Sequence, residues 1–125
     1  MHQLARFYRE RFGRLLELYD DLDGDLVAAY RELADAGVLE LITVGGTHGF
    51  QPTMREPAAR RAQIRVAVAA HKAAFGRAPR GIWLPECGYV PGVDELLAEH
   101  GIEYFFVDSH GIDNASPRPP HGPAA

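Results

Sequence analysis

The sequence predicts an α/β fold in which three parallel strands alternate with helices. Two observations support this prediction: four segments show helical periodicity, and three short apolar runs lie between or after them. Strands that are separated by helices of this length usually lie parallel and are joined by right-handed crossovers. Three strands are too few to close a barrel, and near-continuous apolar strands are expected to be covered on both faces. We therefore interpret the chain as one slice of a larger α/β domain.

Length and composition are those of an ordinary globular domain. The chain has 125 residues, of which 46% are hydrophobic and 24% are charged, and its formal net charge is −4. No cluster of Lys and Arg is dense enough for a nucleic-acid interface, and no apolar run is long enough to cross a bilayer. The first residues lack the apolar stretch of a signal peptide, and a single cysteine excludes an intrachain disulfide framework. We expect a cytoplasmic protein with no nucleic-acid or membrane partner.

Two helices are expected at the start of the chain. Residues 4–19 carry apolar side chains at helical spacing, namely Leu4, Phe7, Tyr8, Phe12, Leu15, Leu16 and Tyr19. A polar break follows, in which Asp23 or Asp25 is a suitable N-cap. The next helix is predicted over residues 26–36, because Gly37 stands where a helix C-terminus favours glycine.

The three strands and the remaining helices follow in alternation. The first strand is predicted over residues 38–44, and a long helix over residues 57–75. The second strand is predicted over residues 81–84, after which Pro91 begins a helix at a first-turn position. The third strand is predicted over residues 102–107.

Polar and ionisable residues follow each predicted strand. They are Thr47 and His48 after the first, Glu86 and Cys87 after the second, and Asp108, Ser109 and His110 after the third. The carboxyl ends of parallel strands meet at one edge of a sheet, so we expect these side chains to share one rim. The pattern predicts a site there and leaves the reaction open.

Several chemistries fit this rim. Glu86 is a candidate nucleophile or acid–base group, with Asp108 as the only nearby second carboxylate. A metal site would draw on His48, Glu86 or Cys87, Asp108 and His110, although their spacing matches no compact signature. Cys87 with His48 or His110 would form a thiol nucleophile pair.

Structural roles compete with each of these assignments. Free cysteine is among the most buried residue types, so Cys87 is also interpreted as an inert buried residue. Asp108 also suits the N-cap of the following segment. Trp83 and Phe105 are expected in the core, and His71 is expected to be a structural or solvated residue on a helix face.

Two stretches resemble a known enzyme family. The sequence GIWLPECGYVPGVDELLAEHGIEYFFVDSHGI, residues 81–112, closely resembles the nucleophile region of glycoside hydrolase family 57. It looks most like the branch of that family that contains 1,4-α-glucan branching enzymes. The sequence LELITVGGTHGFQP, residues 39–52, resembles the family's second sequence region. The similarity extends over about residues 33–122.

The resemblance implies a fold, a reaction and site residues. The family has an incomplete (β/α)7 barrel and acts on α-glucans with retention of configuration, without a metal or an organic cofactor. Residues 1–116 would then form part of the catalytic barrel, and residues 117–125 an irregular Pro-rich tail. Glu86 matches the catalytic nucleophile, and His48 matches a histidine that lines the substrate site. Five further residues fall in matching segments and are expected to bind the α-1,4-glucan substrate: Trp83, Cys87, Tyr89, Asp108 and His110.

The chain also departs from the family pattern. The histidine-containing first motif is missing, and the family's general acid is an Asp that would lie beyond Ala125. Asp108 does not match that residue. We therefore expect the 125-residue chain to be inactive alone. Competing interpretations are a 4-α-glucanotransferase or amylase of the same family, a metal-dependent deacetylase or hydrolase that uses His48, Asp108 and His110, and a glucan-binding segment without chemistry.

Overall fold

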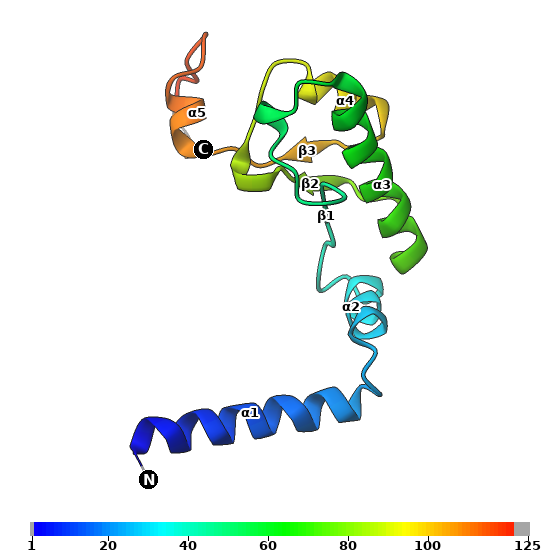
Figure 1. Cartoon of the computed structure of the whole chain (residues 1–125), viewed down its shortest axis with the longest axis vertical. Coiled ribbons are helices and arrows are strands. Elements are labelled where there is room, and N and C mark those ends of the chain that lie inside the picture. Colours follow the sequence, from blue (N-terminus) through cyan, green and yellow to red (C-terminus); the bar gives the residue numbers. More distant parts are fainter. Residues whose placement is uncertain (1, 122–125) are drawn as a thin grey trace. The chain divides into compact units, whose positions relative to one another are not determined.

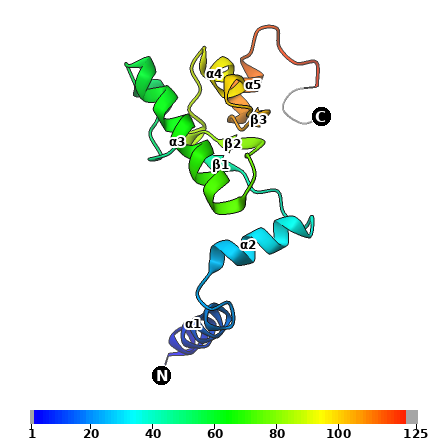
Figure 2. The ribbon, with the colours of Figure 1, turned by 90° about the vertical axis from the view of Figure 1, so that its right-hand side faces the viewer.

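The computed structural model describes residues 2–121, which form two compact units (Figures 1 and 2). The chain divides between Glu40 and Leu41. Among the described residues, no helix is long and apolar enough to span a membrane. The division expected at residue 116 stays a prediction. Residues 114–121 contain no helix or strand, and residues 122–125 of the expected tail lie outside the described range.

The first unit consists of two helices, α1 (Gln3–Asp21) and α2 (Leu26–Asp35). Both helices were expected from the sequence, and α1 is slightly longer than predicted. Asp25 is the N-cap of α2, because its carboxylate accepts a hydrogen bond of 2.8 Å from the Ala28 amide. No residue of either helix is buried within this unit. The apolar faces of both helices are therefore exposed.

The second unit contains a sheet of three parallel strands in the order β1-β2-β3. They are β1 (Thr43–Val44), β2 (Gly81–Trp83) and β3 (Tyr104–Phe105), with Thr43 opposite Ile82 and Ile82 opposite Phe105. The parallel arrangement confirms the sequence prediction.

The predicted strands were too long, and the largest error lies before β1. The amides of Val38 and Leu39 donate to the Leu33 carbonyl, at 2.9 and 3.4 Å. Gly37, with φ of +73°, makes this reversal of the chain after α2. Apolar residues that were assigned to the first strand therefore end the preceding helix.

Two helices cover one face of the sheet. The long helix α3 (Pro57–Phe75) has the predicted bounds, and Gly76 ends it in a left-handed conformation. The shorter helix α4 (Val93–Glu99) lies beside it (Figure 1). Pro91 was predicted to begin this helix, but Gly92, with φ of +90°, is its N-cap and leaves the proline outside. Three short elements were not predicted: η1 (Gln51–Thr53), η2 (Pro85–Cys87) and α5 (Ser109–Asp113).

The core lies between these helices and the sheet. Its buried members are Ile64, Val68, Ile82, Leu84, Val93, Leu96, Leu97 and Ile102. His71 of α3 is also buried, with Nδ1 at 3.0 Å from the Arg77 carbonyl and Nε2 at 3.2 Å from that of Leu41. This confirms a structural role for His71.

The opposite face of the sheet is exposed. Val44 lies opposite Trp83 in the register, and the Trp83 ring packs on Phe106 with ring centroids 5.8 Å apart. Their exposed fractions are 38%, 40% and 45%, respectively. The prediction that Trp83 belongs to the core was wrong, because side chains alternate along a strand and Trp83 points away from the face that receives Ile82.

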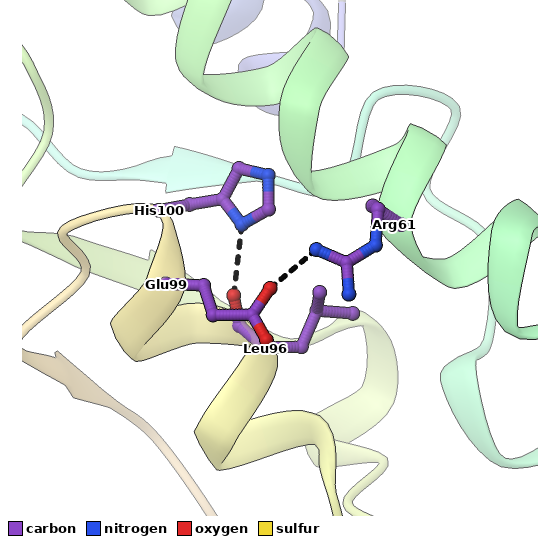
Figure 3. Close-up of polar contacts among 4 residues, drawn as sticks. All are labelled: Arg61, Leu96, Glu99 and His100. Carbon is purple, nitrogen blue, oxygen red and sulfur yellow. Dashed lines mark hydrogen bonds and ion pairs between the residues drawn. The ribbon is translucent and has the colours of Figure 1, made fainter.

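An ion pair joins α3 to α4 at the surface. Arg61 of α3 forms an ion pair with Glu99 of α4, and Nδ1 of His100 lies 2.9 Å from the Leu96 carbonyl (Figure 3). The hydrogen bond from Arg61 holds the pKa of the Glu99 carboxyl below its usual value. The Arg61–Glu99 ion pair links α4 to α3, whereas the His100 contact lies at the end of α4 itself. Helix α4 follows the loop that carries Glu86.

Candidate active site at the carboxyl ends of the strands

The loop after β1 turns sharply to present His48. The His48 amide donates to the Gly45 carbonyl at 2.8 Å, which closes the turn. His48 itself has φ of +55°, in the left-handed region that residues other than glycine seldom adopt. Such residues persist where the surroundings fix them, and they are concentrated at functional sites.

The loop after β2 presents Glu86 in the same way. Leu84 and Pro85 are buried, and their carbonyls accept from the amides of Cys87 at 2.9 Å and Gly88 at 3.0 Å. Between these anchors, Glu86 and Cys87 both have φ of +52°. The turn directs the Glu86 side chain outward, where 78% of it is exposed. The carboxylate at the end of an apolar strand is therefore not buried, and its hydration offsets the cost of its charge.

The two loops pack against each other through Gly88. A Cβ atom on Gly88 would lie 2.4 Å from Cε2 of Phe50 and 2.9 Å from Cδ of Pro52. Only glycine allows this approach of the loop after β2 to the loop after β1. The contact holds the two left-handed turns together at one rim.

His48 and Glu86 meet at this rim. Nε2 of His48 lies 3.3 Å from Oε1 of Glu86. This is the distance of a long hydrogen bond, with the imidazole N–H donating to the carboxylate. The structure thus joins two residues that the sequence separates by 38 positions.

Cys87 lies beside Asp108 rather than beside a base. Desolvation raises the pKa of the Cys87 thiol, and the Asp108 carboxylate raises it further through its charge and a hydrogen bond. A reactive cysteine requires the opposite shift, because the thiolate is the nucleophile. The thiol-nucleophile alternative therefore has no support in this environment.

This environment predicts slow alkylation of Cys87. A raised pKa leaves less thiolate at a given pH, so the rate–pH curve for iodoacetamide shifts to higher pH than that of a small thiol of ordinary pKa. Asp108→Asn removes one cause of the shift and moves the curve back to lower pH. The measurement is mass-spectrometric alkylation of the single cysteine between pH 7 and 10. Alkylation faster than that of the small thiol would contradict the assignment.

A hollow of about 490 Å³ adjoins the rim on the β3 side. Its lining includes Cys87, Tyr89, Phe105, Asp108 and His110. The Tyr89 and Phe105 rings stack with their centroids 5.8 Å apart and an interplanar angle of 7°. Asp108 is the N-cap residue of α5, yet its side chain makes no capping hydrogen bond, so the capping interpretation is not supported. The hollow combines a flat aromatic wall with a carboxylate and an imidazole.

A second hollow, of about 520 Å³, adjoins the rim on the β1 side. It is lined by His48 and Trp83 together with side chains of β1 and α3. The seven candidate residues thus lie around one edge of the sheet: His48, Trp83, Glu86, Cys87, Tyr89, Asp108 and His110. Their contacts with a substrate stay a prediction.

The metal alternative is not supported by the positions of the ligands. Within residues 2–121, no group of three His, Cys, Asp or Glu side chains is placed to hold a metal ion. Nδ1 of His110 lies 4.0 Å from a carboxylate oxygen of Asp108, whereas His48 contacts Glu86. Asp108 and His110 are therefore near each other, but His48, the third ligand that this alternative requires, pairs with Glu86 instead.

One contact to the rim was not predicted from the sequence. Gln63, in the middle of α3, hydrogen-bonds Thr47 through both atoms of its side-chain amide. The available signal was a long polar side chain directly before the buried Ile64. Nothing in the helical spacing indicates which loop such a side chain reaches.

Comparison with known proteins identifies the family. The family model described as Glycosyl hydrolase family 57 matches residues 4–121. The chain belongs to glycosyl hydrolase family 57. The resemblance found in the WLPEC and THGF segments is thereby confirmed, and the match includes the two N-terminal helices as well.

The relatives of this chain include enzymes of more than one named activity. The chain is 38% identical over 117 residues to a 1,4-α-glucan branching enzyme of Thermococcus kodakarensis, covering 82% of this chain and 17% of that protein. The α-amylase AmyC of Thermotoga maritima superposes with a TM-score of 0.87 at 40% identity, over 97% of this chain and 24% of its own. A branching enzyme of Pyrococcus horikoshii superposes with a TM-score of 0.81 at 36% identity, over 90% of this chain and 24% of its own.

These superpositions confirm the fold class predicted from the sequence. The three parallel strands and their helices are an α/β segment of the family 57 fold. The chain spans about a sixth of the length of its first curated relative and about a quarter of these solved relatives.

Proposed function

We propose that this segment supplies the nucleophile side of an α-glucan active site, and that the whole enzyme is a 1,4-α-glucan branching enzyme. The observation that carries the proposal is the rim geometry. Glu86 is exposed in a left-handed turn at the end of a parallel strand, with one oxygen 3.3 Å from His48 Nε2. A carboxylate held in this way at the carboxyl end of a sheet suits attack on a bound substrate.

The proposed reaction is a double displacement. A Glu86 oxygen bonds to the anomeric carbon as the glycosidic C–O bond breaks, which gives a glycosyl ester. A second carboxylic acid protonates the departing oxygen and then takes the proton from the acceptor. The acceptor is a glucan 6-hydroxyl in branching and water in hydrolysis. His48 orients the carboxylate while its charge is lost in the first step and restored in the second.

The surfaces beside the rim suit a glucan chain. Trp83 and the stacked Tyr89 and Phe105 offer apolar ring faces, on which the C–H faces of glucosyl units pack. Asp108 and His110 offer hydrogen-bond partners for sugar hydroxyls. We assign these residues to substrate binding and Glu86 alone to covalent catalysis.

The second carboxylate is expected from outside this segment. We therefore predict that the purified 125-residue chain neither branches nor hydrolyses amylose. The reason is that a retaining pair requires two carboxyl groups about 5–5.5 Å apart, with one acting as acid and base. The measurement is a reducing-end assay together with debranching of the products. Turnover above that of a Glu86→Gln control would contradict the prediction.

The activity itself is tested in a chimera. Residues 4–121 replace the matching segment of the Thermococcus kodakarensis branching enzyme, which supplies the remaining chain. New α-1,6 linkages in amylose support the proposal. New reducing ends without branches indicate an amylase, for which the similarity to AmyC is the specific support. Redistributed chain lengths without either change indicate a 4-α-glucanotransferase.

His48→Asn tests the contact with the nucleophile in the same chimera. Asparagine tolerates left-handed φ better than most residues, so the loop is retained while the imidazole is removed. We expect kcat to fall by about 10²-fold, the order of loss caused by a misplaced reacting group. KM is expected to change little. Unaltered kcat would show that the imidazole does not orient Glu86.

The biological setting is part of the proposal. We infer a role in the synthesis of glycogen-type glucan in the cytoplasm. The support is the named activity of the branching-enzyme relatives.

A further inference from the structure

We propose that Gln63 is a positioning residue, which fixes the loop of residues 45–49 so that His48 reaches Glu86. The amide of Thr47 donates to Oε1 of Gln63 at 2.8 Å, and Nε2 of Gln63 donates to the Thr47 hydroxyl at 2.7 Å. The Gly46 amide also donates to the main-chain carbonyl of Gln63 at 3.0 Å. Three hydrogen bonds therefore join one residue of α3 to two adjacent residues of the loop.

The side-chain amide of Gln63 lies close to the glycines at both ends of the loop. A Cβ atom on Gly45 would lie 3.5 Å from Oε1 of Gln63, and one on Gly49 would lie 3.6 Å from Nε2. A Cβ atom on Gly46 would approach Cγ1 of Val66 to 2.8 Å, closer than such atoms pack. The loop thus packs closely around the Gln63 side chain, which holds the turn in place through its hydrogen bonds.

This support reaches the nucleophile through the next residue along the chain. Thr47 precedes His48, which is held in the left-handed region with φ of +55°. The His48 ring then contacts Glu86 at 3.3 Å. The left-handed conformation of His48 is intrinsically unfavourable, so the surrounding residues must hold it in place. Gln63 does this by fixing Thr47, the residue before His48. The importance of this contact for catalysis rests on the function proposed above.

Three substitutions affect the hydrogen bonds between Gln63 and Thr47 differently. Gln63→Leu has nearly the same shape and neither donor nor acceptor, so it removes both side-chain hydrogen bonds. Gln63→Glu keeps an acceptor for the Thr47 amide, and the Thr47 hydroxyl can reverse and donate to it. Thr47→Val removes only the hydroxyl. Arg65→Leu is the control, because Arg65 is an exposed residue of the same helix.

The test uses NMR of the 125-residue chain and requires no turnover. Two quantities are measured: the exchange rate of the Thr47 amide with solvent, and the shift of the His48 ring signals on Glu86→Gln. We expect Gln63→Leu to speed Thr47 exchange by at least about fivefold, the loss of one ordinary hydrogen bond. It should also abolish the response of His48 to Glu86→Gln. Gln63→Glu and Arg65→Leu should preserve both quantities.

Two outcomes would overturn the proposal. One is a Gln63→Leu chain whose His48 signals still respond fully to Glu86→Gln. The other, which applies if Gln63→Leu does not fold, is a Gln63→Ala chain, which also lacks both side-chain hydrogen bonds, in which Thr47 exchange and the His48 response are unchanged. A failure of the proposed activity would appear in the product linkages of the chimera and leaves these measurements unaffected.

Discussion

Replacing Glu86 by Gln is expected to lower kcat of the chimera by at least about 10⁴-fold, in the range of losses seen when a covalent nucleophile is removed. Glutamine has nearly the same shape and retains an oxygen that His48 can contact at the 3.3 Å site. It does not form the glycosyl ester, because an amide oxygen is a poor nucleophile. KM is expected to remain within a few-fold of its original value, since the glucan contacts lie on other side chains.

The matched control for this substitution is Glu95→Gln. Glu95 lies in the first turn of α4, on an exposed part of the same loop–helix segment. The same chemical change there should leave kcat within about twofold, as expected for a surface substitution. If Glu86→Gln retained more than a hundredth of the activity, the nucleophile would have to be another residue.

Leu84→Ala is expected to destabilise the second unit by about 2–5 kcal/mol, the range measured for buried Leu→Ala changes. Leu84 is 0% exposed and belongs to the core formed by α3, α4 and β2. It directly precedes Pro85 and Glu86, and its carbonyl accepts the Cys87 amide that closes the turn of the nucleophile. A cavity at Leu84 therefore weakens both the core and the support of the rim.

The chain provides its own probe for this measurement. Trp83 is the only tryptophan and lies next to Leu84, so urea unfolding can be followed by its fluorescence. Leu16→Ala is the control, because Leu16 is 61% exposed on α1 and the same change there removes no buried contact. We expect the control to change the free energy of unfolding by less than about 0.5 kcal/mol. Equal effects of the two substitutions would contradict the assignment of Leu84 to the core.

The long helix α3 was predictable because local signals determine its ends. Pro57 at the first position and Gly76 in the left-handed region bound α3, and both are visible in the sequence. Strand lengths were not predictable, because the pairing partner decides where a strand ends. Val38 and Leu39 have the composition of a strand, but their amides donate back to α2.

The candidate site was predictable in outline and not in geometry. The rule that functional groups collect at the carboxyl ends of parallel strands was enough to group His48 with Glu86. The left-handed turns at these residues depend on anchors far along the chain, such as Gln63 and the close approach of Phe50 to Gly88. The exposure of Trp83 depends on which face α3 and α4 cover, and apolar composition alone does not decide this.

The proposed function depends on a covalent bond between Glu86 and a glucosyl unit. The direct measurement is mass spectrometry of the chimera after reaction with a fluorinated glucosyl fluoride, whose glycosyl ester is hydrolysed slowly. We expect one added fluoroglucosyl group on the peptide that contains Glu86, and none in Glu86→Gln. A label on a different carboxylate, or turnover of the reagent without any ester in the active chimera, would contradict it.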